Sequence, residues 1–369
     1  MKKLFLLFVA SMLTVMGAKA DEPSTLVATL SHGGSLTAYY GREALIKAHT
    51  DAREGDIITL SAGKFAVTTI NKSVIIRGMG MWPDKATNND MTTLDGDFEI
   101  LLKNNNAAVG LEGLCCNANL TVRETEKYNK TVTFTKVLFE RTVSIWNDKD
   151  RYPFYPVFNN CLIRDFVVRG GLCQNCRISA LTNYDGDETL AMNNCVLDTY
   201  YSYYGNHTYI HIENASLTNC LLISEAALVL DSKIKADYCV GFSTLKDNGN
   251  YFANIASTTN RMVSDRDNFF KDSSVLTKNE DEYGDFSGYK LANIDATTAD
   301  DINVDGMGIW QLSDEAAKIY KGNDGTVVGV WGGAYPFNVT PGNPRIKKCE
   351  IVPKTDANGK LNVTIEVEQ

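Results

Sequence analysis

The hydrophobic and polar positions of this chain alternate in short runs, and one run recurs. Each copy carries an Asn-Cys dipeptide with isoleucine or leucine two places after the cysteine. The copies are Asn160-Cys161 with Ile163, Asn175-Cys176 with Ile178, Asn194-Cys195 with Leu197, and Asn219-Cys220 with Leu222. Successive cysteines are 15, 19 and 25 residues apart, the scale of one solenoid coil with variable loops. The pattern therefore predicts stacked coils of short β-strands.

Weaker copies extend the repeat in both directions. They are Lys136-Val137-Leu138-Phe139 upstream, and Asp231-Ser232-Lys233-Ile234 or Tyr238-Cys239-Val240-Gly241 downstream. Because a single coil cannot bury its own apolar face, the coils must stack. We expect the cysteines to lie above one another inside as small hydrophobic side chains, and the asparagines to form a ladder of side-chain amide bonds.

The two ends of the repeat region have different patterns. Residues 40–54 predict an amphipathic helix, with Ala44, Leu45, Ala48 and Ala52 at helical spacing, which would cover the open end of the stack. After Pro341, Asn358-Gly359 is a strong hairpin signal, and Leu361 to Val367 alternate apolar and polar. A lone hairpin is marginally stable, so we expect it to dock on the solenoid or on a partner.

The N-terminus is typical of a secretory signal. Lys2 and Lys3 precede an apolar run from Leu4 to Met16, and Ala18-Lys19-Ala20 follows, so residues 1–20 are predicted to be cleaved. The 369 residues carry 36 basic and 45 acidic side chains, and cleavage takes the net charge from -9 to -12. This charge argues against nucleic acid as a partner, and no later stretch predicts a membrane span. The expected location is secreted, periplasmic or cell-surface.

Nine cysteines remain after that cleavage, so at least one is unpaired. Their place in the repeat favours buried packing over disulfides or metal binding. Cys173-Gln174-Asn175-Cys176 is a single C-x-x-C without a second pair, and Cys115-Cys116 predicts one inward and one outward residue of a strand. The pairing of the nine stays open.

Three segments resemble a known superfamily. They are the run from Ala44-Leu45 to Val74-Ile75-Ile76-Arg77-Gly78, Leu111-Glu112-Gly113-Leu114, and Asn323 to Gly333. The chain is similar over roughly residues 36–340 to secreted bacterial right-handed parallel β-helix proteins, the pectin-lyase-like superfamily. The resemblance implies an all-β, right-handed parallel β-helix (solenoid) over residues 21–340 with an N-terminal helical cap, and we assign 341–369 to a linker and β-hairpin appendage. Because that superfamily holds lyases, hydrolases, esterases and members without assigned activity, fold implies no single function.

Catalytic patterns of this superfamily are weak here. Asp165, Asp198 and Glu225 follow their repeat cysteines at offsets of four, three and five, which places them on one surface only if the strands bend. Arg345-Ile346-Lys347 and Ser31-His32-Gly33-Gly34 are similar to polygalacturonase motifs, but they stand in the wrong order, and Asp300-Asp301 lacks its partner motif. We interpret this set as chance, and the catalytic residues stay unknown.

Metal patterns are also weak, and we expect no cofactor. His207 and His211 are four apart, but Thr208-Tyr209-Ile210 predicts a strand, where that spacing is not a metal pair. Calcium stays open at two acidic loops, residues 185–188 and 281–285, although neither fits the twelve-residue calcium loop. Solvated loop acids are the default interpretation.

Aromatic residues are the strongest candidates for binding. One cluster is Tyr200, Tyr201, Tyr203, Tyr204 and Tyr209, and a second is Trp146, Tyr152, Phe154 and Tyr155. Such rings stack on sugars or fill protein hot spots, although packing in the core or under a loop is the alternative. We therefore predict a non-catalytic protein that binds glycan or a surface partner. The alternatives are a polysaccharide lyase or glycoside hydrolase, and a structural or adhesive surface protein.

Overall fold

The structure is a computed structural model of the whole chain. It describes residues 26–82, 91–103, 106–126, 128–146, 154–184, 189–199, 210–224, 228, 230–243, 249–271, 276–280, 286–291, 310–338, 345–351 and 363–368. The predicted signal peptide lies outside these ranges. Among the described residues the protein is mostly strands, with two helices, α2 (Ala44–Asp51) and α3 (Asp314–Ile319). Neither helix is long and apolar enough to cross a membrane.

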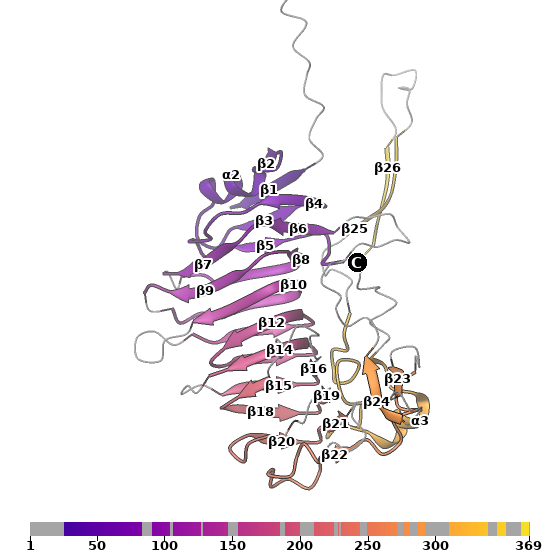
Figure 1. Cartoon of the computed structure of the whole chain (residues 1–369). Helices are drawn as coiled ribbons and strands as arrows, with labels where there is room; N and C mark the ends of the chain where they lie inside the picture. Colours follow the sequence, from indigo (N-terminus) through magenta and orange to yellow (C-terminus); the bar gives the residue numbers. More distant parts are fainter. Residues whose placement is uncertain are drawn as a thin grey trace, which may run out of the picture.

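Most strands pair in parallel with the coils above and below, and they stack in three columns (Figure 1). The first column holds β3 (Ile57–Leu60), β5 (Ile75–Arg77), β8 (Val109–Cys116), β10 (Val132–Trp146), β11 (Pro156–Asn159), β13 (Gly171–Gln174), β15 (Leu190–Asn193), β18 (Ala215–Thr218) and β20 (Lys235–Asp237). The second holds β4 (Gly63–Ala66), β6 (Thr92–Asp95), later parts of β8 and β10, β12 (Leu162–Val168), β14 (Arg177–Asn183), β16 (Val196–Thr199), β19 (Leu221–Ser224), β21 (Val240–Ser243) and β22 (Arg261–Met262). The third holds β7 (Phe98–Leu102), β9 (Leu120–Glu124), the ends of β10, β12 and β14, and β17 (Ile210–Ile212). The protein is therefore an all-β, solenoid-like stack, as the repeat predicts.

The recurring asparagine forms the corner between the first and second columns. The left-handed φ values are 53° at Asn160, 50° at Asn175, 52° at Asn194 and 56° at Asn219, with 53° at Lys136 and 54° at Tyr238 in the weaker copies. Asparagine tolerates this backbone region better than most residues because its short side chain bonds locally. The Asn-Cys dipeptide is thus a corner followed by an inward-facing residue.

Seven of the eight cysteines whose side chains the structure describes lie in the interior of the coils, which confirms the packing prediction. Cys115 instead packs in a second apolar cluster outside the coils, so Cys115-Cys116 is one outward and one inward residue, as predicted. All eight are buried and free. The backbone N–H of Cys161 donates to Sγ of Cys176 on the next coil at 3.4 Å. Burial raises the pKa of the Cys161 and Cys195 thiols, so both stay protonated. The side chain of Cys349 lies outside the described part.

The N-terminal end carries the predicted helix and a hairpin that the sequence did not indicate. Helix α2 is shorter than residues 40–54, because β2 (Ser35–Tyr40) extends through Tyr40 and the backbone is extended at Ala52. Its apolar side is buried as expected. Strand β1 (Val27–His32) pairs antiparallel with both β2 and β3, so this end differs from the parallel stack (Figure 1).

Lys72 holds the C-terminus of α2. Its Nζ donates to three backbone carbonyls, those of His49 at 2.8 Å, Thr50 at 2.6 Å and Ala52 at 2.7 Å. A cation at this position satisfies free carbonyls and complements the helix dipole. The burial of His49 and the nearby charge of Lys72 lower the pKa of that imidazole to about 4.

A segment far along the chain covers the outer side of the second column. Residues 310–338, named the strap here, bring Trp310, Leu312 and Val330 against outward-facing Val196 and Val240 in one apolar cluster. Figure 1 shows α3, which belongs to the strap, beside β21 and β22.

Three of the four repeat asparagines bond to the strap and not to one another, so the predicted ladder between them is wrong. Nδ2 of Asn175 donates to the carbonyls of Val330 at 2.9 Å and Gly332 at 2.7 Å. Nδ2 of Asn219 donates to Asn323 Oδ1, and its Oδ1 accepts from the Asn323 backbone N–H, each at 2.9 Å. Oδ1 of Asn160 accepts from the Asn338 N–H at 2.7 Å. These three amides take their partners from the strap, whereas Nδ2 of Asn194 is buried and has no hydrogen-bond partner among the described residues.

Two further hairpins follow the stack. Strands β23 (Leu276–Glu280) and β24 (Phe286–Leu291) pair antiparallel, as do β25 (Arg345–Ile351) and β26 (Val363–Glu368). The second pairing confirms a C-terminal hairpin, although Asn358-Gly359 lies outside the described residues. Its docking surface and the boundary at residue 341 stay predictions.

Candidate functional site

Outward-facing residues of the third column form a continuous row across four coils. Arg123 pairs in register with Trp146, and the register pairs Ser144 with Val167, Val168 with Asn183, and Asn183 with Ile212 continue the row. This register places Trp146, Arg169, Tyr184 and Glu213 at equivalent positions of successive coils. We name these four residues the lateral strip.

The aromatic members of the lateral strip are open to solvent. Trp146 is 48% exposed and Tyr184 is 43% exposed. They lie two coils apart, which corresponds to roughly 10 Å along the stack, about the span of a disaccharide. Nε of Arg169, between them, is buried and has no partner among the described residues. The strip thus presents two exposed rings, with Arg169 at the register position between them.

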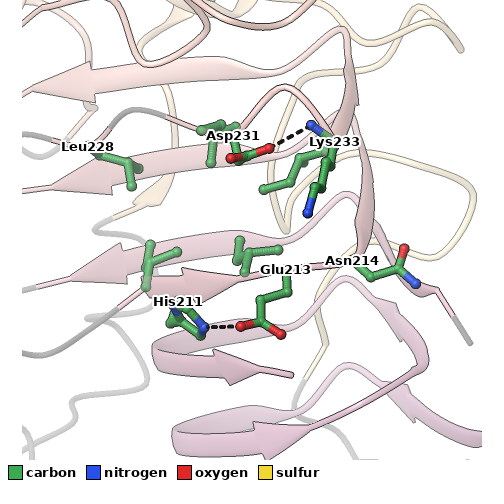
Figure 2. A pocket seen from close by; sticks show the side chains of 10 residues that line it. His211, Glu213, Asn214, Leu228, Asp231 and Lys233 are labelled. Atoms are coloured by element: carbon green, nitrogen blue, oxygen red, sulfur yellow. Dashed lines mark hydrogen bonds and ion pairs between the residues drawn. The ribbon is translucent and has the colours of Figure 1, made fainter. Parts of the chain in front are cut away.

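A pocket of about 570 Å³ adjoins the end of the lateral strip. Its walls come from β17, the turn after it and the segment before β20. The lining residues are Ile210, His211, Ile212, Glu213, Asn214, Leu228, Leu230, Asp231, Lys233 and Ile234. Figure 2 shows the row of His211, Glu213 and Asn214 facing the row of Leu228, Asp231 and Lys233. The pocket is therefore polar at its rims, with aliphatic side chains between them.

The polar groups of the pocket are already oriented. His211 Nε2 lies 2.8 Å from Glu213 Oε1, and Asp231 Oδ1 accepts from the Lys233 N–H at 2.9 Å. The His211 ring centroid lies 6.4 Å from that of Tyr184 at an interplanar angle of 62°. Carboxylates on opposite walls and one ammonium give the acceptors and donors that bind hydroxyl groups.

A buried asparagine fixes the corner between the strip and the pocket. Asn183 is fully buried, and its Nδ2 donates to the Arg169 carbonyl at 2.7 Å. Its Oδ1 accepts from the Asn214 N–H at 2.9 Å on the following coil. One amide thus links three coils and holds Tyr184 and Glu213 in place on either side.

The structure reaches only part of the predicted aromatic site. Tyr152, Tyr200, Tyr201, Tyr203, Tyr204 and Tyr209 lie outside the described residues. Trp146 is exposed and belongs to the lateral strip, whereas Phe154 is buried. Sequence reasoning missed Tyr184 and Glu213, and it weighed His211 only as a metal ligand. The alternation of Thr182, Tyr184, His211 and Glu213 as outward positions was the available signal.

The predicted acidic row does not form from the two described acids. Asp165 pairs in register with Ala180 of β14. Leu197 pairs with Ile178, so the next residue, Asp198, lies opposite Ser179 of the same strand. Asp198 is fully buried, whereas Asp165 is partly exposed, so the two carboxylates do not share one open surface. Asp165 accepts from Thr142 Oγ1 at 2.8 Å. Glu225 lies outside the described residues.

Asp198 belongs instead to a buried polar cluster beneath the strap. Its Oδ2 lies 2.7 Å from Arg177 Nη2, and Ser179 Oγ donates to its Oδ1 at 3.2 Å. Burial raises the pKa of Asp198, although the neighbouring Arg177 and Ser179 oppose that shift. The guanidinium carbon of Arg177 lies 5.6 Å from the centre of the Trp310 ring. This cluster is sealed from solvent and anchors the strap.

The remaining candidate motifs are structural where they are described. Ser31-His32-Gly33-Gly34 includes the β1–β2 turn, with φ of 54° at Gly33 and 84° at Gly34, and His32 Nδ1 lies 2.7 Å from Asp56 Oδ1. Within the described part, no cluster of three or more His, Cys, Asp or Glu side chains is arranged to hold a metal ion. His207, residues 185–188 and 281–285, and Asp300-Asp301 fall outside that part. Arg345 to Lys347 begin β25.

The fold and the site define a class: an all-β protein of stacked, largely parallel strand coils with a lateral pocket. No family model, curated protein or solved structure matches this chain.

Proposed function

We propose that this chain is a secreted, right-handed parallel β-helix protein of the pectin-lyase-like type, which binds an extracellular polysaccharide without cleaving it. The observation that carries the proposal is the alignment of two exposed rings, Trp146 and Tyr184, in one column that leads to the pocket at His211 and Glu213. A linear glycan runs along the stack axis, with sugar rings on the aromatic faces and hydroxyl groups at the pocket.

The chemistry of the strip favours a sugar over an apolar peptide. Rings with polar neighbours stack on the C–H faces of sugars, while the Glu213 and Asp231 carboxylates accept bonds from hydroxyls. Tyr200 to Tyr209 directly precede Ile210 of the pocket in sequence. We include these tyrosines in the binding surface.

A protein that only binds the polysaccharide forms no cleavage products, whereas a lyase or a hydrolase does. Glu213 already accepts a bond from His211, and Asp231 from the Lys233 backbone, so both are fixed as binding groups. A hydrolase would need one carboxylic acid and one carboxylate flanking the scissile bond. Reducing ends or unsaturated products from a polysaccharide panel would overturn the binding-only proposal.

The test is retention of the purified protein in affinity gels that contain each polysaccharide, with and without calcium. We expect one polymer to slow wild-type protein, and Trp146→Ala and Tyr184→Ala each to weaken binding by about fivefold, since one aromatic contact contributes about 1 kcal/mol. Tyr335→Ala is the matched control, because Tyr335 is 77% exposed but lies in the strap. Tyr201→Ala with Tyr203→Ala tests the adjoining loop.

Two results count against the proposal. Equal retention of Trp146→Ala, Tyr184→Ala and wild type would place any glycan site elsewhere. Absence of retention with every polymer would shift the function to a protein partner or a structural role.

A further inference from the structure

Strand β2 is an edge strand without the usual protection against pairing. Among the described residues it pairs only with β1, in six uninterrupted pairs from His32–Ser35 to Val27–Tyr40. Its sequence, Ser-Leu-Thr-Ala-Tyr-Tyr, holds no charge and no proline, and its register shows no bulge. Natural edges are normally blunted by such features.

The hairpin geometry fixes which backbone groups of β2 face outward. The two-residue turn at Gly33-Gly34 makes His32 and Ser35 a hydrogen-bonded pair, and the Gly41 N–H donating to the Leu26 carbonyl at 2.9 Å continues that alternation. Ser35, Thr37 and Tyr39 therefore bond to β1, whereas Leu36, Ala38 and Tyr40 present their N–H and C=O groups to the free edge.

The side chains of the outward set are also exposed. Leu36 is 73% exposed and Tyr40 is 60% exposed, and with Ala38 they share one face of the strand. Two large apolar side chains on six residues of an uncharged edge are unusual for a free surface. Figure 1 shows β2 at the N-terminal end of the stack, opposite the end that holds β20.

We infer that β2 pairs antiparallel with β2 of a second copy of this chain, about a two-fold axis at Ala38. In that register Leu36 meets Tyr40 of the other copy, Ala38 meets Ala38, and every outward N–H finds an outward C=O. The pairing is isologous and joins two stacks end to end.

Charge favours a second copy as the occupant. The chain is acidic, with net charge -9, so two copies repel except where their surfaces are neutral. Close to β2, Arg42 lies 2.6 Å from Asp95, and the Asp51 carboxylate accepts from the Tyr39 hydroxyl at 2.7 Å. β2 carries no charged side chain that a charged partner could bind, whereas the identical neutral strand of a second copy can pair with it. This inference is independent of the proposed glycan binding.

Sedimentation velocity of the purified protein from low to high micromolar concentration tests the pairing. A six-residue strand buries a small interface, so we expect a concentration-dependent monomer–dimer equilibrium. Ala38→Lys places two like charges opposite each other on the axis and should abolish the dimer. Thr37→Lys is the matched control, since its backbone bonds to β1 and its side chain lies on the other face. Circular dichroism confirms that both variants fold.

A cysteine substitution gives a second readout. Paired residues of a hydrogen-bonded antiparallel pair have Cα atoms about 5.5 Å apart, which suits a disulfide, so Ala38→Cys should give a covalent dimer on oxidation and Thr37→Cys should not. Three results would overturn the β2 pairing: a monomer at all concentrations, a dimer that Ala38→Lys does not weaken, or an equal loss of dimer in Ala38→Lys and Thr37→Lys. A monomer at all concentrations would leave the β2 edge to a different partner.

Discussion

Replacement of Asn175 should separate the two roles of a corner asparagine. The residue adopts a left-handed φ of 50°, and its Nδ2 donates to the carbonyls of Val330 and Gly332 in the strap. Asn175→Gly keeps the left-handed backbone but removes both bonds. Asn175→Ala removes both bonds and also places a Cβ in an unfavourable backbone region.

The structure sets the expected magnitudes. After either change the Val330 carbonyl still accepts from the Phe337 N–H at 2.8 Å, so the Gly332 carbonyl is the group left without this partner. Two lost bonds, one of which leaves a buried carbonyl, give a loss of about 2–3 kcal/mol in the free energy of unfolding for Asn175→Gly. The left-handed penalty adds about 1 kcal/mol more for Asn175→Ala.

Urea unfolding, followed by tryptophan fluorescence and far-ultraviolet circular dichroism, measures both effects. Two of the four tryptophans, Trp310 and Trp331, lie in the strap, so part of the fluorescence change reports its release, while circular dichroism reports the strands. Tyr238→Asn is the control: it has φ of 54° and should gain stability of about 0.5–1 kcal/mol without touching the strap bonds. Equal stability of the Ala and Gly variants would refute the backbone argument, and wild-type stability in both would refute the strap argument.

Three further predictions concern buried ionisable side chains. The pKa of His49 is lowered to about 4, so its imidazole stays neutral in the folded state at pH values where the same group in the unfolded chain binds a proton. The free energy of unfolding is therefore highest above pH 6.5 and falls by about 2 kcal/mol toward pH 4. His49→Leu should flatten this part of the pH profile of urea midpoints. Lys72→Met removes three bonds to carbonyls and should cost about 2 kcal/mol in thermal unfolding, while raising the pKa of His49, measured by NMR titration. Asp198→Asn leaves Arg177 without its counter-ion beneath Trp310 and should cost about 3–5 kcal/mol, whereas Arg177→Met with Asp198→Leu should cost less; the reverse order in urea unfolding would contradict this account.

The repeat could be predicted from sequence because its causes are local. An asparagine tolerates the corner, a cysteine fits the interior, and a β-branched or leucine residue two places on faces the same side. These constraints act within four residues, so they recur visibly. The helix α2 was visible for the same reason, although its start was not, since β2 extends through Tyr40.

The lateral strip could not be predicted because it depends on register between coils. Trp146, Tyr184 and Glu213 are separated by loops of unequal length, and sequence spacing does not tell which residues become neighbours. The β1–β2 hairpin was missed for a different reason. Gly33-Gly34 follows His32, so the same four residues fit both a histidine motif and a two-residue turn, and the sequence alone does not distinguish them.

The strap shows why the asparagine ladder was a reasonable but wrong prediction. An amide at a left-handed corner needs partners, and without a cover the nearest partner is the amide of the next coil. Here the strap approaches so closely that a Cβ on Gly322 would lie 2.5 Å from Cγ of Asn219, and one on Gly332 would lie 2.8 Å from Nδ2 of Asn194. The glycines of the strap and the asparagines of the corners therefore depend on each other across more than 100 residues of chain. In the sequence, the strap glycines and the corner asparagines lie in two separate segments. In the structure, they form one contact line along which the strap packs on the second column.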